Sequence, residues 1–254
     1  SEVLSLSGGL ETLILDAGNP FFRQFELEIG EPWGNMYSRG FERDDQNRVI
    51  VNADGTPSVT DGKSVLIGNY NPDWLGGISN SFRYKNLSLS FLIDIRQGGV
   101  IGSLTNAILA SDGALDVTTI GRDGTLVFGD NVFGDLEVVK ADGTPNDIQT
   151  DAETFWASIG GRNAPVGEAF VEDASNIRMR EITLGYSLPS SLIDRTPFRN
   201  IKLTLVGRNL FFFSNSASVD PEVIVDPTLT SADGYESFSP PSTRSLGLNL
   251  KFGF

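Results

Sequence analysis

The last thirteen residues of the chain, STRSLGLNLKFGF, end in an alternation of apolar and polar side chains that has no break. In a β-strand, successive side chains point to opposite faces. The segment therefore predicts a strand with one fully apolar face and one polar face that carries Asn249 and Lys251. Such a strand is typical of the end of a membrane β-barrel, and also of the last strand of a soluble β-sandwich. The apolar face consists of Leu246, Leu248, Leu250, Phe252 and Phe254.

The same alternation recurs in five segments upstream. Most of them have the length of about ten residues that crosses a bilayer when a strand is tilted. The last of the five becomes irregular from Val206 onward, which indicates a β-bulge. The first is carried by Phe21, Phe25, Leu27 and Ile29, opposite Gln24, Glu26 and Glu28. The five segments are residues 21–29, 74–85, 86–100, 180–188 and 201–213.

Charged residues lie on the polar faces of two neighbouring segments. Arg83 and Lys85 belong to the first, and Asp94 and Arg96 belong to the second. Their alternation with apolar residues places them on the lumen side of a barrel wall. There they form salt bridges along the wall or contact a solute, and the sequence leaves both interpretations open.

The connections between these segments are very unequal in length. Residues 84–86 form a tight turn and residues 189–200 a short link, whereas three long polar stretches separate the other segments. Outer-membrane barrels have short turns on the periplasmic side and long loops on the outside. Residues 101–175 hold 13 acidic and 3 basic residues, so this predicted outside loop carries most of the net charge of −14. The long stretches are residues 41–73, 101–175 and 214–241.

Composition excludes several classes of function. The net charge of −14 argues against nucleic-acid binding, which needs a basic face for the phosphates. The chain has neither cysteine nor histidine, so thiolate nucleophiles, disulfides and the commonest general base and metal ligand are absent. The sequence contains no run of 18 apolar residues that would predict a transmembrane helix. Its first residues do not resemble a signal peptide.

Two recurrent features of the long stretches have both a structural and a functional interpretation. Asp-Gly pairs recur in them, and such pairs favour tight turns because glycine accepts a left-handed conformation. Clustered carboxylates also suit Ca²⁺, although the spacing lacks the EF-hand pattern. Trp33, Trp74 and Trp156 are able to stack on sugar rings, but Trp33 and Trp74 fit an interfacial aromatic belt or loop packing better.

Several segments resemble the SusC/RagA family of TonB-dependent outer-membrane transporters. ASNIRMREITLGYSLP at residues 174–189 is similar to that family's "ASyvRLRelTLGYsLP" strand. GRNL at 207–210 resembles its "GxNL" segment, and DPEV at 220–223 resembles the "DPEv" that follows. GNYNPDW and FRYKN, between residues 68 and 86, resemble "GNxxPxw…sfxYKnf". Gly98-Gly99 and the closing STRSLG match as well, so the motifs run in family order from residue 68 to the last residue.

The resemblance implies a fold and an organisation. We expect an all-β chain, residues 1–254, that forms the last six or so strands of a transmembrane antiparallel up-and-down barrel of about 22 strands. The plug domain and the earlier strands of such a barrel would lie outside this chain, because so few strands cannot close around a lumen. Leu246, Leu248, Leu250, Phe252 and Phe254 are expected to act as the terminal insertion signal.

The resemblance also implies a function without covalent chemistry or a cofactor. A transporter of this family would import glycans, oligosaccharides or peptides across the outer membrane of a Gram-negative envelope. A SusD-like surface lipoprotein would cover it, and TonB–ExbB–ExbD would energise it through the N-terminal part. Two alternatives remain: a barrel that serves as scaffold in an assembly or secretion complex, and a secreted carbohydrate-binding β-sandwich.

Overall fold

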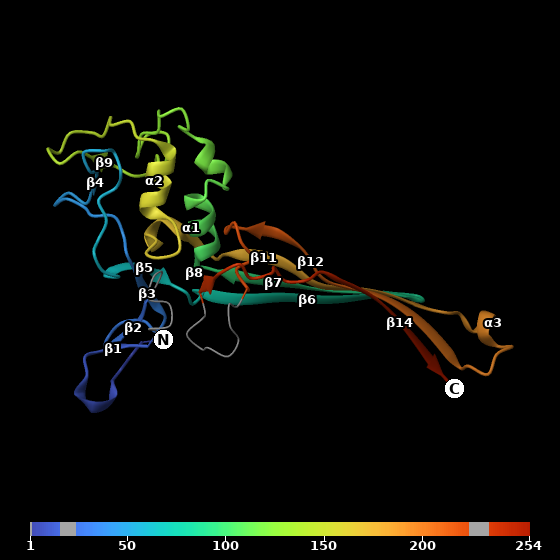
Figure 1. The fold of residues 1–254 in the computed structure, drawn as a ribbon. Helices are drawn as coiled ribbons and strands as arrows, with labels where there is room; N and C mark the ends of the chain where they lie inside the picture. The colour runs from blue at the N-terminus through green and yellow to red at the C-terminus, as the bar shows by residue number, and fades with distance from the viewer. Residues whose placement is uncertain (1, 16–23, 224–233) are drawn as a thin grey trace. The chain divides into compact units, whose positions relative to one another are not determined.

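The structure, a computed structural model, describes residues 2–15, 24–223 and 234–254 (Figure 1). Contacts divide the chain into two compact units, each built from segments that are far apart in the sequence. The first unit comprises Ser1–Asn71, Val100–Glu172 and Ile224–Ser239. The second unit comprises Pro72–Gly99, Asp173–Val223 and Pro240–Phe254.

The second unit is a sheet of five long antiparallel strands in the order β14-β12-β11-β7-β6. It holds five of the six predicted strands. A short helix, α3 (Ser190–Ile193), lies in the link between β11 and β12. The strands are β6 (Trp74–Tyr84), β7 (Leu87–Gln97), β11 (Asn176–Ser187), β12 (Asn200–Asn215) and β14 (Ser245–Gly253).

The register aligns the apolar side chains of neighbouring strands on one face of the sheet. Leu248 of β14 pairs with Leu205 of β12, which pairs with Leu184 of β11, which pairs with Leu89 of β7. Many large side chains of this face are exposed, Leu248 for example by 66%, while those in the middle of the sheet, such as Leu89 and Phe91, are half-buried. A one-residue slip would move every one of them to the other face. The predicted alternation is therefore confirmed, and it produces one continuous apolar surface.

Short connections lie at one end of the sheet and long ones at the other. Tyr84 pairs with Leu87 across the β6–β7 turn, and Leu87 also pairs with Tyr186 near the end of β11. Asn200, at the start of β12, pairs with Gly253 at the end of β14. The tight turn, the α3 link and the end of β14 thus share one end, as the sequence predicted.

Two register shifts between β11 and β12 interrupt the regular pairing. Met179 pairs with Phe211 and Glu181 pairs with Arg208, which leaves Arg180 as an extra residue on β11. On β12 the extra residues include Asn209, whose φ of 49° is the left-handed conformation that asparagine tolerates. The irregularity that the sequence indicated after Val206 is a β-bulge.

The described residues of the first unit form short strands, two α-helices and three 3₁₀ turns. A four-stranded sheet has the order β1-β2-β3-β5, a three-stranded sheet the order β10-β8-β13, and β4 pairs with β9. The strands are β1 (Thr12–Ile14), β2 (Gln24–Glu28), β3 (Asn35–Ser38), β4 (Val49–Ile50), β5 (Val65–Asn69), β8 (Val100–Ser103), β9 (Val138–Val139), β10 (Val171–Asp173) and β13 (Tyr235–Glu236). The helical elements are α1 (Leu104–Ser111), α2 (Ala152–Ile159), η1 (Ser7–Gly9), η2 (Asp116–Thr119) and η3 (Gly167–Phe170).

The long polar stretches of the sequence fold around an apolar core of their own. Phe128 lies at its centre, with its ring 5.3 Å from those of Phe41 and Phe155 and 5.7 Å from that of Phe133. Burying aromatic side chains supplies the main favourable free energy of such a core. The sequence was interpreted as loop here because its apolar residues follow no period. None of the described helices is long and apolar enough to cross a membrane.

One predicted strand has a different place from the one expected. The segment that begins at Phe21 was grouped with the barrel strands, but its described part forms β2 in the four-stranded sheet of the first unit. Phe25 is buried there in a small cluster with Met36 and Ile67. Phe21 itself lies outside the described residues. The period of two identified a strand correctly, but it could not identify the sheet to which the strand belongs.

The two faces of β14 predict opposite responses to the same substitution. Leu248→Arg places a charge on the apolar face and should destabilise the inserted full-length protein by about 2–4 kcal/mol near the bilayer midplane, less near an interface. Asn249→Arg, on the polar face, should cost little. Unfolding free energies in lipid vesicles measure both variants. The reverse order would show that the faces are assigned the wrong way round.

Candidate functional site

A cluster of charged side chains lies on the polar face of the five-stranded sheet. We name it the Arg178 cluster. It brings together two strands of the sheet, the bulge of a third, the segment that follows β12 and the segment that precedes β14. Its members are Asp94, Arg178, Arg180, Asn209, Asp220, Glu222 and Ser242.

Arg178 is the most deeply buried member, with an exposed fraction of 1%. Its guanidinium donates to Asp220 at 2.5 Å, to Glu222 at 3.0 Å and to the hydroxyl of Ser242 at 2.9 Å. It also lies 4.0 Å from the centre of the Phe212 ring. Burying a guanidinium is costly unless anions and hydrogen bonds replace water. The three oxygen partners and the ring replace water around Nη1 and Nη2, whereas the buried Nε has no hydrogen-bond partner.

A bulge at Arg180 of β11 places Arg180 and Glu181, as well as Arg178, on the polar side of the sheet. Arg180 donates to Asp94 at 2.5 Å, to Asn209 at 3.0 Å and to Glu222 at 2.5 and 2.9 Å. In an uninterrupted strand, Arg180 and Glu181 would point to opposite faces. The extra residue lets both face the polar side, where Glu181 accepts from Arg208 at 2.8 Å.

Asp220 joins the segment after β12 to the segment before β14. It accepts from the backbone N–H of Ser242 at 3.1 Å and from the hydroxyl of the same residue, and the N–H of Glu222 donates to it at 3.1 Å. Burial alone would raise the pKa of Asp220. The hydrogen bonds from Ser242 and Glu222 and the charge of Arg178 outweigh burial, so the pKa lies below its ordinary value.

A pocket of about 500 Å³ borders the Arg178 cluster on the sheet. Asp94, Arg180 and Glu222 contribute charged groups to it, while Gly77 of β6, which pairs with Asp94, leaves room because it carries no side chain. The wall thus combines apolar surface, from Leu75 and Ile95, with charged groups of both signs. It has the chemistry to contact a polar solute by hydrogen bonds, and it offers no nucleophile and base pair for covalent catalysis. The full lining is Leu75, Gly76, Gly77, Asp94, Ile95, Arg96, Asn176, Arg180 and Glu222.

The predicted lumen residues can be located by register. Arg83 pairs with Ser88, which places it on the face that Asp94 and Arg96 share. Asn249 and Lys251 pair with Thr204 and Lys202 and occupy the same face at the other side of the sheet. Five of the six candidates therefore share one face, but only Asp94 and Arg96 line the pocket. The five on this face are Arg83, Asp94, Arg96, Asn249 and Lys251. Contact between any of the six candidates and a solute stays a prediction.

Lys85 and the predicted insertion signal are placed elsewhere. Lys85 lies in the β6–β7 turn with a φ of 51°, and its ammonium is 5.4 Å from the centre of the Tyr84 ring. Leu246, Leu248, Leu250 and Phe252 lie on the apolar face of β14. Phe254 follows the strand; it is 80% exposed, with its ring 5.2 Å from that of Phe198. Their role in insertion stays a prediction.

Arg178, Arg180, Asp220 and Glu222 were not predicted as site residues. They occur in the RMR and DPE segments, which the sequence analysis used only as family motifs. The available signal was the presence of two arginines in one motif and two carboxylates in another. The pairing between them could not be derived, because it depends on the bulge at Arg180 and on the path of the chain after β12.

The Asp-Gly pairs form turns, as predicted. Gly55, Gly113, Gly124 and Gly143 all have positive φ values. Asp54 and Asp142 each accept hydrogen bonds from the N–H and the hydroxyl of the threonine two residues later, and these bonds lower the pKa of each carboxyl. In the described ranges, no group of three or more acidic side chains is placed to hold a metal ion.

The three tryptophans have different environments. Trp33 donates to the Tyr70 hydroxyl at 2.9 Å in the first unit, whereas Trp156 is buried in the core. Trp74 begins β6 on the apolar face and is half exposed. The position of Trp74 fits the interfacial belt that the sequence indicated for it.

Comparison with known proteins shows similarity to TonB-dependent receptors. The chain is 26% identical to TonB-dependent receptor P3 of Formosa agariphila over 270 residues, covering 95% of this chain and 25% of that receptor. It is 29% identical to receptor P26 of the same organism over 207 residues, covering 79% and 19%. It is 24% identical to TonB-dependent receptor SusC of Bacteroides thetaiotaomicron over 242 residues, covering 93% and 20%. The chain thus spans about a fifth to a quarter of the length of these relatives. No protein-family model matches it.

Solved structures show the same fold. The RagAB peptide importer in its "closed-closed" state matches 100% of this chain and 26% of its own chain, with a TM-score of 0.62 at 19% identity. The "open-open" state matches with a TM-score of 0.58 at 18% identity, again over 100% of this chain. The expected fold class, an all-β portion of a TonB-dependent barrel, is therefore confirmed.

The burial of Arg178 predicts a large loss of stability when its charge is removed. Arg178→Met leaves Asp220 and Glu222 without their buried cation and should cost about 3–5 kcal/mol. Arg208→Met is the matched control, because Arg208 pairs with Glu181 while 63% of its side chain is exposed, and it should cost about 1 kcal/mol or less. Unfolding free energies of the full-length protein measure both. Equal costs would contradict a stabilising role for the cluster.

Proposed function

Since the chain is SusC/RagA-like, we propose that it forms the C-terminal wall of an outer-membrane importer that takes up glycans, oligosaccharides or peptides. The two-faced sheet is the observation that carries the proposal. Its apolar face is continuous across five strands and exposed, which suits lipid. Its opposite face is polar and holds the Arg178 cluster and the adjoining pocket, which suits a water-filled conduit for polar solutes.

The proposed topology follows from the common end of the short connections. Outer-membrane barrels have their short turns on the periplasmic side. The β6–β7 turn, the α3 link and the end of β14 are therefore proposed to be periplasmic. The first unit, whose segments leave the opposite end of the strands, is then on the outside of the cell.

Two partners complete the proposal. A SusD-like surface lipoprotein is proposed to dock on the outside, where the acidic first unit lies, and to deliver solute. TonB–ExbB–ExbD is proposed to supply energy through parts of the protein that precede the matched region. The similarity to SusC and to the fold of the RagAB importer supports both partners.

Transport is tested by deleting the gene and restoring the full-length protein. Loss of the protein should abolish energised uptake of at least one labelled oligosaccharide or peptide, and its return should restore that uptake. A protonophore should abolish the restored uptake, because import through such a barrel needs the energised inner membrane. Unchanged uptake across the panel, together with impaired assembly or secretion of other envelope proteins, would support the scaffold alternative instead.

Cysteine labelling tests the topology separately. The chain has no cysteine, so single cysteines serve as clean probes once any others in the full-length protein are replaced. Asp142→Cys, in the first unit, should react with a membrane-impermeant thiol reagent on intact cells. Ser191→Cys, in α3, should react only after the outer membrane is opened. Both side chains are exposed in the structure, so burial does not explain a difference. Labelling of Ser191→Cys alone on intact cells would invert the topology.

A further inference from the structure

The end of the sheet that carries the short connections differs in charge from the rest of the chain. It runs from the paired residues Arg83, Ser88, Gly185, Thr204 and Asn249 to the β6–β7 turn, the α3 link and the end of β14. This end holds six basic residues and one acidic residue, whereas the whole chain has a net charge of −14. The basic residues are Arg83, Lys85, Arg195, Arg199, Lys202 and Lys251, and the acidic residue is Asp194.

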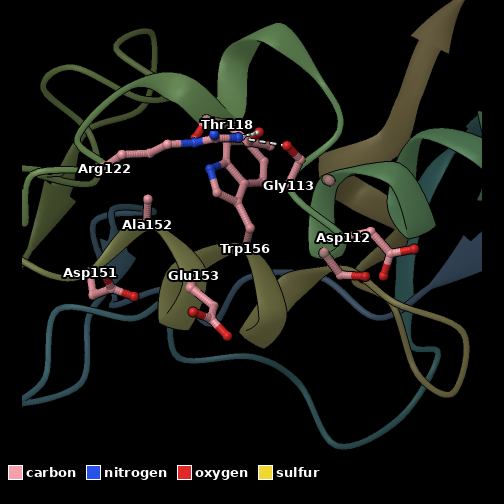
Figure 2. A pocket seen from close by; sticks show the side chains of 10 residues that line it. Asp112, Gly113, Thr118, Arg122, Asp151, Ala152, Glu153 and Trp156 are labelled. Carbon is pink, nitrogen blue, oxygen red and sulfur yellow. Dashed lines mark hydrogen bonds between the residues drawn. The ribbon is translucent and has the colours of Figure 1, made fainter.

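The first unit has the opposite balance of charge. Its pocket of about 570 Å³ between α1, η2 and α2 is lined by three carboxylates, on Asp112, Asp151 and Glu153, and by the guanidinium of Arg122 (Figure 2). Charges of opposite sign thus collect on different parts of the chain. A basic region in an acidic protein favours an anionic partner at that region.

An apolar cluster adjoins the basic residues. The ring of Phe198, in the α3 link, lies 5.0 Å from that of Phe252 and 5.2 Å from that of Phe254. Phe252 belongs to the apolar face of β14, so the three rings extend that face to the end of the sheet. Leu192 of α3 adds a further exposed apolar side chain in the same link. Aromatic residues at the rim of a lipid-facing surface suit the membrane interface.

The α3 link has a defined backbone conformation at this end. Ile193 is buried, and its carbonyl oxygen accepts from the N–H of Thr196 at 2.8 Å and from the hydroxyl of the same residue at 2.7 Å. The N–H of Arg199 donates to the carbonyl oxygen of Gly253 at 2.7 Å. These contacts fix the chain next to Arg195 and at Arg199. The link is formed before any ligand arrives, which reduces the entropy cost of binding.

The two arginines of the link have no anion beside them. Both residues are exposed. Among the described residues, no ion pair and no side-chain hydrogen bond involves the guanidinium of Arg195 or Arg199. A guanidinium presents paired N–H donors that match the oxygens of a phosphate. Since Arg195 precedes Phe198 by three residues and Arg199 follows it directly, two such groups flank an apolar ring.

We propose that the α3 link binds the headgroup of an anionic phospholipid. Arg195 and Arg199 would pair with the phosphate, and the rings around Phe198 would contact the acyl chains below it. The inference rests on the proposed function, because it requires the apolar face to lie in the outer membrane and this end to face the periplasm. An acidic soluble protein fits less well, because it would leave the adjoining rings in water.

Net charge should decide which phospholipid is held. A zwitterionic lipid offers the same phosphate but adds an ammonium group, which the basic residues repel. The detergent-solubilised full-length protein is mixed with equal amounts of phosphatidylglycerol and phosphatidylethanolamine that have the same acyl chains, and native mass spectrometry measures which lipid it retains. Phosphatidylglycerol should be retained several-fold more than phosphatidylethanolamine. The preference should fall when ammonium acetate is raised from about 0.05 M to about 0.5 M, because salt screens exposed charges.

Three variants separate position, charge and apolar contact. Arg195→Gln with Arg199→Gln should remove the preference. Lys202→Gln with Lys251→Gln removes two charges at the same end of the sheet, but these two residues pair with each other on the polar face, so the preference should remain. Phe198→Ala should reduce retention of both lipids by a similar factor. Thermal unfolding in detergent checks that each variant is folded.

Three results would each overturn the proposal: equal retention of the two lipids by the unmodified protein, a preference that survives loss of both arginines, or an equal loss of preference in the lysine variant. Lipid retention is measured without transport, so it is independent of the uptake experiment. Failed uptake with an intact preference for phosphatidylglycerol would reject the proposed import alone, whereas normal uptake without that preference would reject only the lipid site.

Discussion

The period-two alternation of side chains in paired strands is the constraint on which the sheet depends. Once Leu248, Leu205, Leu184 and Leu89 are in register, every residue between them must lie on the opposite face. The apolar face then needs an apolar environment, because water would leave it unfavourably exposed. The polar face, by the same geometry, holds the groups that meet water and solute. An apolar face that suits lipid and a polar face that suits a water-filled conduit are thus two consequences of a single register.

The bulge modifies that constraint at the place where charge is concentrated. Strict alternation allows only one of two adjacent residues to reach the polar side, whereas the extra residue lets both Arg180 and Glu181 reach it. Arg180 then joins Asp94 of one neighbouring strand to Asn209 of the other and to Glu222 beyond β12. Because Arg178 is buried beside it, the cluster also holds the segment after β12 against the segment before β14. The same side chains therefore stabilise the sheet and border the pocket.

The sequence predicted what depends on local period and missed what depends on tertiary contact. The strands of the sheet, the short turns and the face of Asp94 and Arg96 all follow from alternation, which is local. The Arg178 cluster could not be predicted, since Arg178 and Asp220 are 42 residues apart and meet only through the bulge and a long connection. The core around Phe128 and Trp156 was missed because its residues come from irregular segments. The family motifs contain Arg178, Arg180, Asp220 and Glu222, but the motifs do not show that these side chains contact one another.

The two units differ in which side chains they bury: the first buries apolar side chains, whereas the sheet exposes many of them and buries a charged one. This difference suggests that the two units face different solvents. In the first unit, Phe128 and Phe155 are fully buried and the carboxylates of the Asp-Gly turns Asp54 and Asp142 lie at the surface. In the sheet, Leu248 and Phe82 are exposed while Arg178 is buried. A water-soluble body has the first arrangement, and a wall between lipid and water has the second. In the proposed topology, Trp74, at the start of β6, has the position of an aromatic residue at the membrane interface.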